Sequence, residues 1–445
     1  MPKDIVSLTS ELEERYIASS PRSRQMFELA SGVMPGAAKG AYYHKPYPLS
    51  MDKGEGCYVW DVDGRRFADF ANHHTGQIIG HRNPNVMAAI EEQLTKGIVL
   101  GAPVGMEADL AAEICRRVPS VESVRFTNSG TEATLHIVRL ARGITGRHKI
   151  AKFEGGYHGQ HDAVEISVAP SLDDAGSATA PNAVAQVKGI APRAVEEAVI
   201  LPYNDPESVQ RLIEQHKDEL ACVMFDPKAG IMPQRPEFVQ FVRQITADND
   251  VLMVFDEIVG FGTGVGGLQT HYGVKPDLTS FGKVIGGGFP VGAFGGRADL
   301  MERFNAVKGS SGFFQSGTYS GHPVTMAAGL ASLTTLNEEA FAHLENLGDR
   351  LCSGLNALFK DAGFPAQAVH NGPVFSIHFT TEELLNYRAL SGGNKDFIMP
   401  MYLMLLEQGY FACYAISMSA LSLPMDTEHI DGFIAAVGST LGRLI

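Results

Sequence analysis

The 445-residue sequence contains few cysteines and no long hydrophobic run. Its five cysteines are odd in number, widely spaced and never form a C-x-x-C pair, so neither a disulfide framework nor a zinc ribbon is indicated. No run of about 18 apolar residues is free of charge, and the N-terminus lacks the apolar region of a signal peptide. The sequence therefore predicts a soluble cytoplasmic protein without a membrane segment.

Positive charge is also scarce. The 36 Lys and Arg residues against 50 Asp and Glu residues give a formal net charge of −14, and no basic block offsets it. This balance disfavours binding to nucleic acids and to anionic membranes. With 44% hydrophobic residues, the chain is able to bury a sizeable core and to form two or three domains.

Hydrophobic patterns divide the chain into three parts. In residues 1–75 we expect a helix that starts at a capping box of Ser10 and Glu13, followed by a small antiparallel meander over about residues 42–70. These residues are predicted to form the N-terminal segment of a small lobe.

In residues 76–318, helical stretches alternate with short β-rich runs, which predicts an α/β domain with a mostly parallel sheet covered by helices on both faces. Residues 319–445 are predicted to complete the small domain as an α+β unit. Within the large domain, residues 166–195 are rich in Ala, Pro, Ser and Gly, and we interpret them as an ordered functional loop or lid, the alternative being disorder.

The first chemical feature is the segment Asn128–Thr131, which ends a strand-like run and opens a helix. Free N–H groups and hydroxyls at a helix N-terminus form a phosphate site, although the same residues also suit a plain helix cap.

The second feature is the glycine-rich segment Gly155–Gly159 around Tyr157. Its glycines allow close backbone approach, so the Tyr157 ring is able to stack on a flat ligand. A metal site built on His158, His161 and Asp162 is disfavoured because the glycines oppose the helix that would align the histidines and no further ligand stands out. A purely structural turn remains the other alternative.

The third feature is Asp256, which closes the apolar run VLMVFD and precedes Glu257. It places a carboxylate at the edge of the sheet where ligands bind, or caps a helix. Residues 262–267 match the dinucleotide fingerprint G-x-G-x-x-G, but Pro276 follows too soon for the required helix, so a nicotinamide site is not indicated.

The fourth feature is Lys283, which lies between apolar residues and glycines. Poor solvation lowers the pKa of such a lysine and makes it a nucleophilic amine. A phosphate cradle, a stacking ring, a carboxylate and a Schiff-base lysine together are the parts that hold pyridoxal 5′-phosphate.

The motifs TNSGTEA, GGYHG, VFDEI and LTSFGKVIGGGFPVGAFGGR resemble those of the class III, fold-type I aminotransferases. The closest likeness is to the branch of glutamate-1-semialdehyde aminomutase and β-phenylalanine aminotransferase. The resemblance implies that residues 76–318 form the pyridoxal-phosphate domain, and it assigns catalytic roles to Lys283, Asp256 and Tyr157. It also implies that the cofactor is bound by Ser129, Gly130, Thr131, Tyr157, His158, Asp256, Lys283 and Thr318. Thr318 resembles the residue that reaches the phosphate from a neighbouring subunit, which implies a homodimer.

The substrate segments depart from this pattern. The arginines and the glutamate by which these relatives bind their substrates have no counterpart in AAKGAYYHKPYP or YAISMSALSLP. The substrate residues expected instead include Lys39, Tyr42 and His74, with Tyr43, His44 and His73 as further candidates for the pocket wall.

We therefore expect an aminotransferase that moves an amino group from a β-amino acid or an aromatic or apolar primary amine to a keto acid by a ping-pong cycle. No metal is expected. Two alternatives remain open, a 2,1-aminomutase of the glutamate-1-semialdehyde type and a non-catalytic protein that binds the cofactor.

Overall fold

The computed structural model of the chain describes residues 5–40, 43–308 and 312–444. The chain divides into two compact units. Unit 1 comprises Met1–Pro84, Glu339–Glu382 and Gly392–Ile445, so it joins the two ends of the chain. Unit 2 comprises Asn85–Glu338 together with the short segment Glu383–Ser391.

Unit 2 is built on a seven-stranded sheet with the strand order β4-β12-β11-β10-β9-β5-β8. β12 is antiparallel to both of its neighbours, and the other adjacent pairs are parallel. The prediction of a mostly parallel sheet is thus confirmed. The strands are β4 (Ser123–Thr127), β5 (Lys149–Phe153), β8 (Ala198–Leu201), β9 (Leu220–Phe225), β10 (Leu252–Asp256), β11 (Leu278–Gly282) and β12 (Gly292–Gly296).

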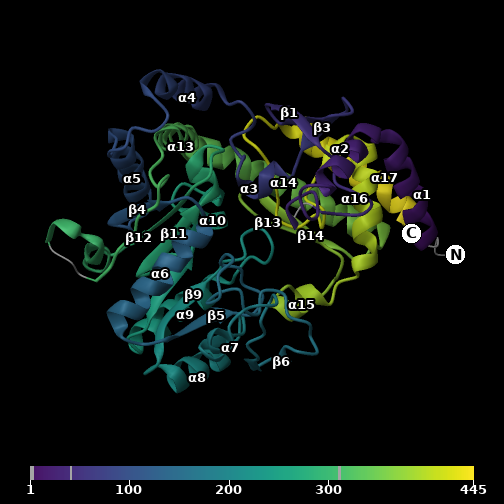
Figure 1. Cartoon of the computed structure of the whole chain (residues 1–445). Helices are drawn as coiled ribbons and strands as arrows, with labels where there is room; N and C mark the ends of the chain where they lie inside the picture. The colour runs from purple at the N-terminus through teal and green to yellow at the C-terminus, as the bar shows by residue number, and fades with distance from the viewer. Residues whose placement is uncertain (1–4, 41–42, 309–311, 445) are drawn as a thin grey trace. The chain divides into compact units, whose positions relative to one another are not determined.

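Helices cover this sheet because its residues are apolar toward both faces. All six residues of the central strand β9 are buried, which requires packing on each side. The helix α6 (Gly130–Thr145) packs its apolar stripe, including Ile137 and Ala141, against the strands (Figure 1). The other helices of this region are α4 (Pro84–Lys96), α5 (Gly105–Arg117), α7 (Pro192–Glu196), α8 (Pro206–His216), α9 (Pro236–Asp248), α10 (Glu257–Gly260), α11 (Gly267–His271), α12 (Ala298–Met301), α13 (Pro323–Thr335) and α15 (Tyr387–Ser391).

Unit 1 contains the predicted meander. β1 (Met51–Glu55), β2 (Tyr58–Asp61) and β3 (Arg66–Asp69) pair antiparallel, and β15 (Tyr410–Phe411) adds to β3 in parallel. A second sheet has the order β13-β14-β16. Its strands are β13 (Gln367–Asn371), β14 (Val374–His378) and β16 (Ser419–Ala420), and the helices of the unit are α1 (Ile5–Ser19), α2 (Pro21–Ser31), α3 (Asn72–Thr75), α14 (Glu338–Ala362), α16 (Ile398–Glu407) and α17 (Thr427–Leu444). Among the helices described, none is long and apolar enough to cross a membrane.

The predicted helix start at Ser10 is wrong. Ser10 lies inside α1, where its Oγ donates to the carbonyl of Val6 at 3.1 Å. The buried stripe of Leu8, Leu12 and Tyr16 extends to residues before Ser10, so packing continues the helix past the apparent cap.

The segment 166–195 contains a small hairpin of β6 (Gly176–Ser177) and β7 (Ala180–Pro181). Arg388 holds it, donating to the carbonyls of residues 175–177 while its guanidinium pairs with Glu154 at 3.0 Å. Through these contacts the segment is tied to the end of β5, and its function as a lid stays a prediction.

Candidate functional site

The four features predicted from the sequence lie at one edge of the sheet in unit 2. The strands β5, β10 and β11 are parallel, and β4 runs in the same direction because the antiparallel β12 separates it from β11. Their carboxyl ends therefore meet at one edge, where ligands of such sheets bind. This edge carries the segment 128–131, the loop 155–159, Asp256 and Lys283.

The N-terminus of α6 follows directly on β4. Ser129 caps the helix, since its Oγ accepts a hydrogen bond from the Glu132 N–H at 3.2 Å. Two glycines make room around it: a Cβ at Gly292 would lie 2.0 Å from the Ser129 carbonyl oxygen, and one at Gly130 would lie 2.5 Å from Ile258 Cδ1. The first N–H groups of a helix have no carbonyl partner within it, so this half-buried turn is suited to bind an anion as well as to cap the helix.

Asp256 ends β10 and is almost completely buried. Its Oδ1 accepts a hydrogen bond from the Ile258 N–H at 3.1 Å, and its Oδ2 lies 2.8 Å from Nδ1 of the fully buried His158. The carboxylate is therefore held in one orientation by two partners from different segments of the chain.

Lys283 follows β11 and begins a short 3-10 helix, Lys283–Gly286. Its φ of 54° lies in the left-handed region, which costs a non-glycine residue about 1–2 kcal/mol. The neighbouring glycines pack tightly, because a Cβ at Gly287 would lie 2.4 Å from the carbonyl oxygen of Ala328 in α13. Close packing against α13 thus holds the turn that bears Lys283 in place, although the backbone of Lys283 is strained.

Tyr157 lies in the loop after β5, and the residue is 51% exposed. Partial burial raises the pKa of its hydroxyl, and the carboxylates of Glu165 and Asp256 raise it further. The preceding Gly155 has a φ of 82°, and a Cβ there would lie 2.6 Å from the Tyr387 ring. Only glycine fits this position, so the loop takes a path that leaves the Tyr157 ring accessible.

Three residues of this edge were not predicted from the sequence. Ile258 packs against the positions of Gly130 and Gly282, and Asp226 accepts a hydrogen bond from the Tyr157 N–H at 3.1 Å. Ser280 is paired with Asp256 in the sheet register, and its Oγ is fully buried without a hydrogen-bond partner among the described residues. Only Asp226 had a clear signal, since it closes the apolar run LACVMFD just as Asp256 closes VLMVFD.

The histidines considered for a metal site have other contacts. His158 is engaged by Asp256, and Nε2 of His161 lies 3.3 Å from the Thr134 hydroxyl. Burial lowers the pKa of His161 to about 4, and neighbouring His158 contributes in the same direction. His161 is thus a neutral residue packed against α6.

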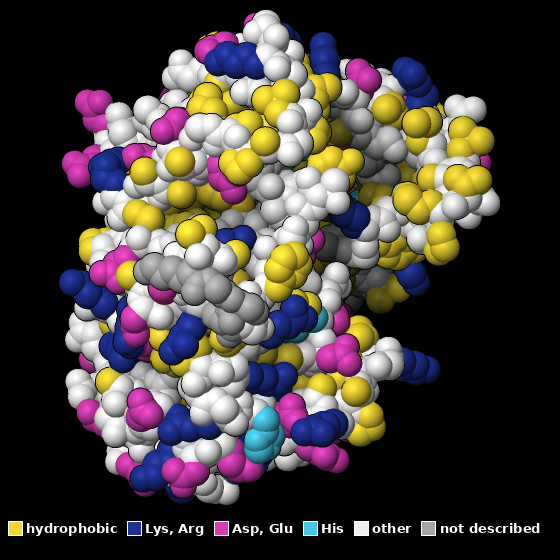
Figure 2. All heavy atoms as spheres, turned by 60° about the vertical axis from the view of Figure 1, so that its left-hand side comes forward, with side chains coloured by type: hydrophobic (Ala, Val, Ile, Leu, Met, Phe, Trp, Pro, Cys, Tyr) yellow, Lys and Arg dark blue, Asp and Glu magenta, His cyan; other side chains and the backbone are white. Residues whose placement is uncertain are grey.

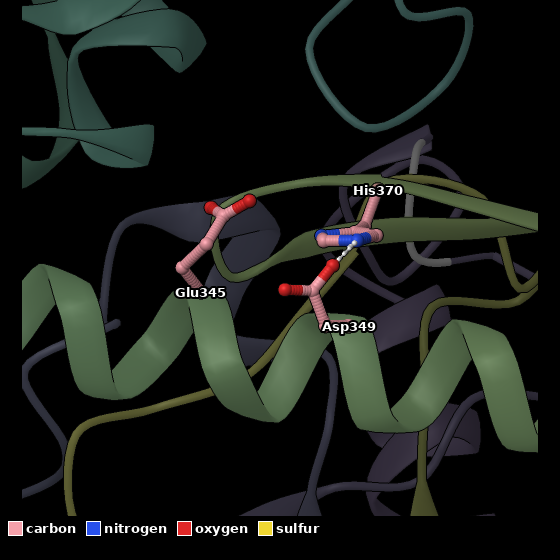
Figure 3. A group of neighbouring side chains, drawn as sticks. All are labelled: Glu345, Asp349 and His370. Atoms are coloured by element: carbon pink, nitrogen blue, oxygen red, sulfur yellow. Dashed lines mark ion pairs between the residues drawn. The ribbon is translucent and has the colours of Figure 1, made fainter.

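A cluster of metal-ligand type lies elsewhere, in unit 1. Figure 3 shows Glu345 and Asp349 on α14 and His370 on β13. His370 Nε2 lies 3.3 Å from Asp349 Oδ1, and its Nδ1 lies 3.2 Å from the carbonyl oxygen of Gly372. Both carboxylates are exposed, and an ordinary surface ion pair accounts for the arrangement.

Unit 1 contains a cavity of about 540 Å³. Its wall includes two residues of the expected substrate set, Lys39 and His74, and the further candidates His44 and His73. No arginine is found among the described residues that line it. Tyr42 lies outside the described residues, and Tyr43 is exposed and is not part of this wall.

The two histidines His73 and His74 enter the cavity from a strained turn. The four residues Asn72–Thr75 have φ values of 42°, 51°, 52° and 71°, so they form one left-handed turn. Asp69 anchors this turn, since its Oδ1 accepts the N–H groups of residues 71 and 72, both at 2.9 Å. A run of left-handed residues without glycine is costly and is typical of functional sites.

His44 is the buried member of this wall. Burial lowers its pKa, and Nδ1 lies 3.0 Å from the carbonyl oxygen of Lys45. The ring stacks on Tyr414 with centroids 5.8 Å apart. His44 Nε2 has no hydrogen-bond partner within the described chain, so a neutral imidazole acceptor is left for a ligand in this wall.

Thr318, predicted to act across a subunit boundary, is exposed. Gly317, the residue before it, lies against the turn of residues 128–131 in the same chain, because a Cβ at Gly317 would lie 3.2 Å from Asn128 Nδ2. Thr318 is thus accessible to a second chain, and its role stays a prediction.

Comparisons with known proteins give a consistent result. The family model described as aminotransferase class III matches residues 40–405. A glutamate-1-semialdehyde 2,1-aminomutase of Methanocaldococcus jannaschii is 36% identical over 429 residues, which are 94% of this chain and 97% of that protein. An omega-transaminase from Sphaerobacter thermophilus has a similar structure, with a TM-score of 0.91, 38% identity and coverage of 95% of this chain and 97% of that chain. A β-phenylalanine aminotransferase from Variovorax paradoxus has a TM-score of 0.89 and 34% identity, with coverage of 99% and 98%.

Proposed function

The chain belongs to the class III aminotransferases, which are pyridoxal-phosphate enzymes, and on this premise we propose that it transfers an amino group from a β-amino acid or an aromatic or apolar primary amine to a keto acid. One observation supports amino-group chemistry most directly. Asp256, Lys283 and the N-terminus of α6 lie at the same edge of one sheet within unit 2.

The residues of this edge fit pyridoxal 5′-phosphate. Glycines keep side chains away from the α6 turn, and the buried Ser280 hydroxyl beside Asp256 still needs a polar partner. We assign the phosphate to the turn of Ser129, Gly130 and Thr131, with Thr318 of a second chain. When bound, the cofactor withdraws electrons from the substrate carbon that loses a proton.

Asp256, Tyr157 and Lys283 have different roles in the proposed reaction. The Asp256 carboxylate holds a proton at the pyridine nitrogen, and His158 and the Ile258 N–H keep this carboxylate oriented. The Tyr157 ring would hold the flat cofactor by stacking. The Lys283 amine would anchor the cofactor and would serve as the general base that takes the proton from the substrate carbon.

The donor class is inferred from the cavity in unit 1. Its wall has histidines, Lys39 and aromatic residues but no arginine among the described residues, so it lacks a bidentate clamp for a carboxylate. We propose that Lys39 and His74 recognise the substrate there, and that a carboxylate is held by single cationic or imidazole donors. The β-phenylalanine aminotransferase among the structural neighbours supports the β-amino acid as one donor.

A 2,1-aminomutase reaction is the second candidate. The similar aminomutase of M. jannaschii supports it at least as well as the structural neighbours support a transaminase. Such an enzyme moves an amino group within one substrate and releases no keto product. The intact pair of Lys283 and Asp256 suits both reactions and speaks against a non-catalytic binding protein.

We further propose a homodimer. Exposed hydrophobic side chains support a homodimer. Figure 2, in which the left-hand side of Figure 1 is turned toward the viewer, shows many hydrophobic side chains on that face. The large exposed apolar residues of unit 2 include Leu94, Ile98, Val99, Leu100, Val307, Phe314 and Tyr319. Leu94, Ile98, Val99 and Leu100 lie within seven residues of the chain, and exposed apolar patches mark protein interfaces.

The deciding experiment follows the visible absorption of the purified holoenzyme while donors are added without an acceptor. Loss of the 
cofactor band with β-phenylalanine, together with a keto product, supports the β-amino acid transaminase. Loss with a simple aromatic amine alone makes the enzyme an amine transaminase. A band that responds to neither donor, but responds to glutamate-1-semialdehyde without release of a keto product, overturns the proposal in favour of the aminomutase.

A further inference from the structure

Charged side chains converge on the backbone of the loop that carries Tyr157. Lys228 Nζ donates to the Gly155 carbonyl at 2.6 Å, and Lys152 Nζ donates to the Gly156 carbonyl at 2.8 Å. The same peptide group is also held at its N–H, because Asp226 Oδ2 accepts the Tyr157 N–H at 3.1 Å. Two successive peptide groups are thus bound through three hydrogen bonds by two lysines and an aspartate.

These side chains also support one another. Lys228 Nζ lies 3.5 Å from Asp226 Oδ2, and Lys152 donates a further hydrogen bond to the carbonyl of Ile166. Burial raises the pKa of Asp226, but Lys228, His158 and backbone N–H groups lower it more, so the net pKa is below its usual range. The carboxylate is therefore ionised and accepts the Tyr157 N–H strongly.

Lys152 is unusual because it is completely buried at the end of β5. Its burial lowers the pKa to about 7, with a contribution from the charge of Lys228. A buried ammonium that bonds only carbonyls costs several kcal/mol, whereas an apolar residue would fill the same space without this cost. The position therefore indicates a role beyond packing.

The Tyr157 ring needs such support. The residue is 51% exposed, so solvent covers much of the ring, and the two glycines before it have no side chains that could hold the loop. Its direction depends on the peptide groups before it.

We propose that Lys152, Lys228 and Asp226 form a charged clamp that positions Tyr157 for stacking on the cofactor. All three are positioning residues that act through Tyr157. The inference rests on the proposed function, since it concerns the same site, but the clamp itself is a property of the chain without cofactor.

Two measurements test the clamp. In the cofactor-free protein, Lys152→Met and Lys228→Met are expected to speed amide hydrogen exchange at residues 155–158, and Lys149→Met is the control. Lys149 lies on the same strand and pairs with Glu219 at 2.7 Å. In titrations with pyridoxal 5′-phosphate, each clamp variant is expected to weaken binding about tenfold or more, which matches the loss of one hydrogen bond to a charged group.

A double-mutant cycle separates positioning from stability. In a Tyr157→Ala background, Lys152→Met is expected to change cofactor affinity by less than about twofold, because the residue it positions is absent. The proposal is overturned if Lys152→Met lowers cofactor affinity equally in both backgrounds. It is also overturned if the variant lowers the melting temperature but leaves amide exchange at residues 155–158 unchanged. If Lys152→Met does not fold, Lys228→Met, whose side chain is 11% exposed, decides by the same readouts. Wild-type protein that does not bind the cofactor contradicts the proposed function, while loop exchange still tests the clamp.

Discussion

His158 Nδ1 lies 2.8 Å from Asp256 Oδ2, and both side chains are buried. Asp256 ends β10 and His158 lies in the loop that follows β5, so both reach the same edge of the sheet. A carboxylate fixed by these two partners keeps its remaining lone pairs in one orientation. The histidine therefore acts on the chemistry through Asp256.

Replacing His158 is expected to impair turnover more than folding. His158→Phe removes the donor to Asp256 and is expected to lower kcat about tenfold to a hundredfold, the range for one hydrogen bond to a charged group. His158→Asn is the matched control, since its amide is able to donate to the same oxygen and is expected to restore part of the rate. Steady-state kinetics together with melting curves check this, and a His158→Phe enzyme with unchanged kcat would contradict it.

Lys283→Ala is expected to abolish turnover. The substitution removes the amine that anchors the cofactor and moves the proton, while alanine relieves little of the backbone strain at a φ of 54°. We expect the purified variant to lose the visible band of the wild-type holoenzyme but to keep its melting temperature without cofactor. Activity retained above the background rate would sink the assignment of Lys283.

The cavity in unit 1, where we propose that the substrate binds, allows a comparison of two lysines. Lys39→Met is expected to raise the KM for β-phenylalanine about fivefold, the scale of one partly exposed ion pair, and to leave the KM for an aromatic amine unchanged. Lys53→Met is the control, because Lys53 lines the same cavity but its Nζ lies 4.9 Å from the Trp60 ring centroid. Equal effects on both donors would show that Lys39 does not recognise a carboxylate.

The sequence was informative where one residue carries its own signal. The position of Asp256 after an apolar run, and of Lys283 among glycines, predicted that both lie at the ends of strands. The alternation of helices and strands predicted the sheet. These patterns work because the carboxyl ends of parallel strands must meet at one edge.

Residues that act through contacts distant in sequence had no such signal. Lys152 reads as an ordinary lysine in KIAKF, and only the fold shows that it is buried beneath the Tyr157 loop. Ser10 looked like a helix cap because packing of Leu8 was not visible in a local pattern. The left-handed turn at 72–75 was equally hidden, since no local pattern predicts four consecutive non-glycine residues at positive φ.

Glu257, next to Asp256, gives a prediction for pH. It is fully buried, and its oxygens accept the N–H groups of Leu268 and Gln269 at 3.2 and 2.7 Å. Burial raises its pKa from 4.5 to about 7, although these hydrogen bonds oppose the shift. Glu257 thus holds the first turn of α11, and its own carboxyl is largely neutral near pH 6.

The sign of the effect on stability follows from this shift. Between pH 7 and 4.5 the folded chain binds a proton at Glu257 that the unfolded chain does not, so the free energy of unfolding rises as the pH falls. Each pKa unit corresponds to about 1.4 kcal/mol, which gives about 3 kcal/mol over the whole window.

Glu257→Gln removes the titrating group, and the contributions of other ionisable groups cancel in the difference in unfolding free energy between the two proteins. Urea unfolding at several pH values is expected to show the wild type gaining stability relative to Glu257→Gln from pH 7 to 4.5, while the exposed Glu237→Gln control follows the wild type. Parallel curves for wild type and Glu257→Gln would contradict the raised pKa.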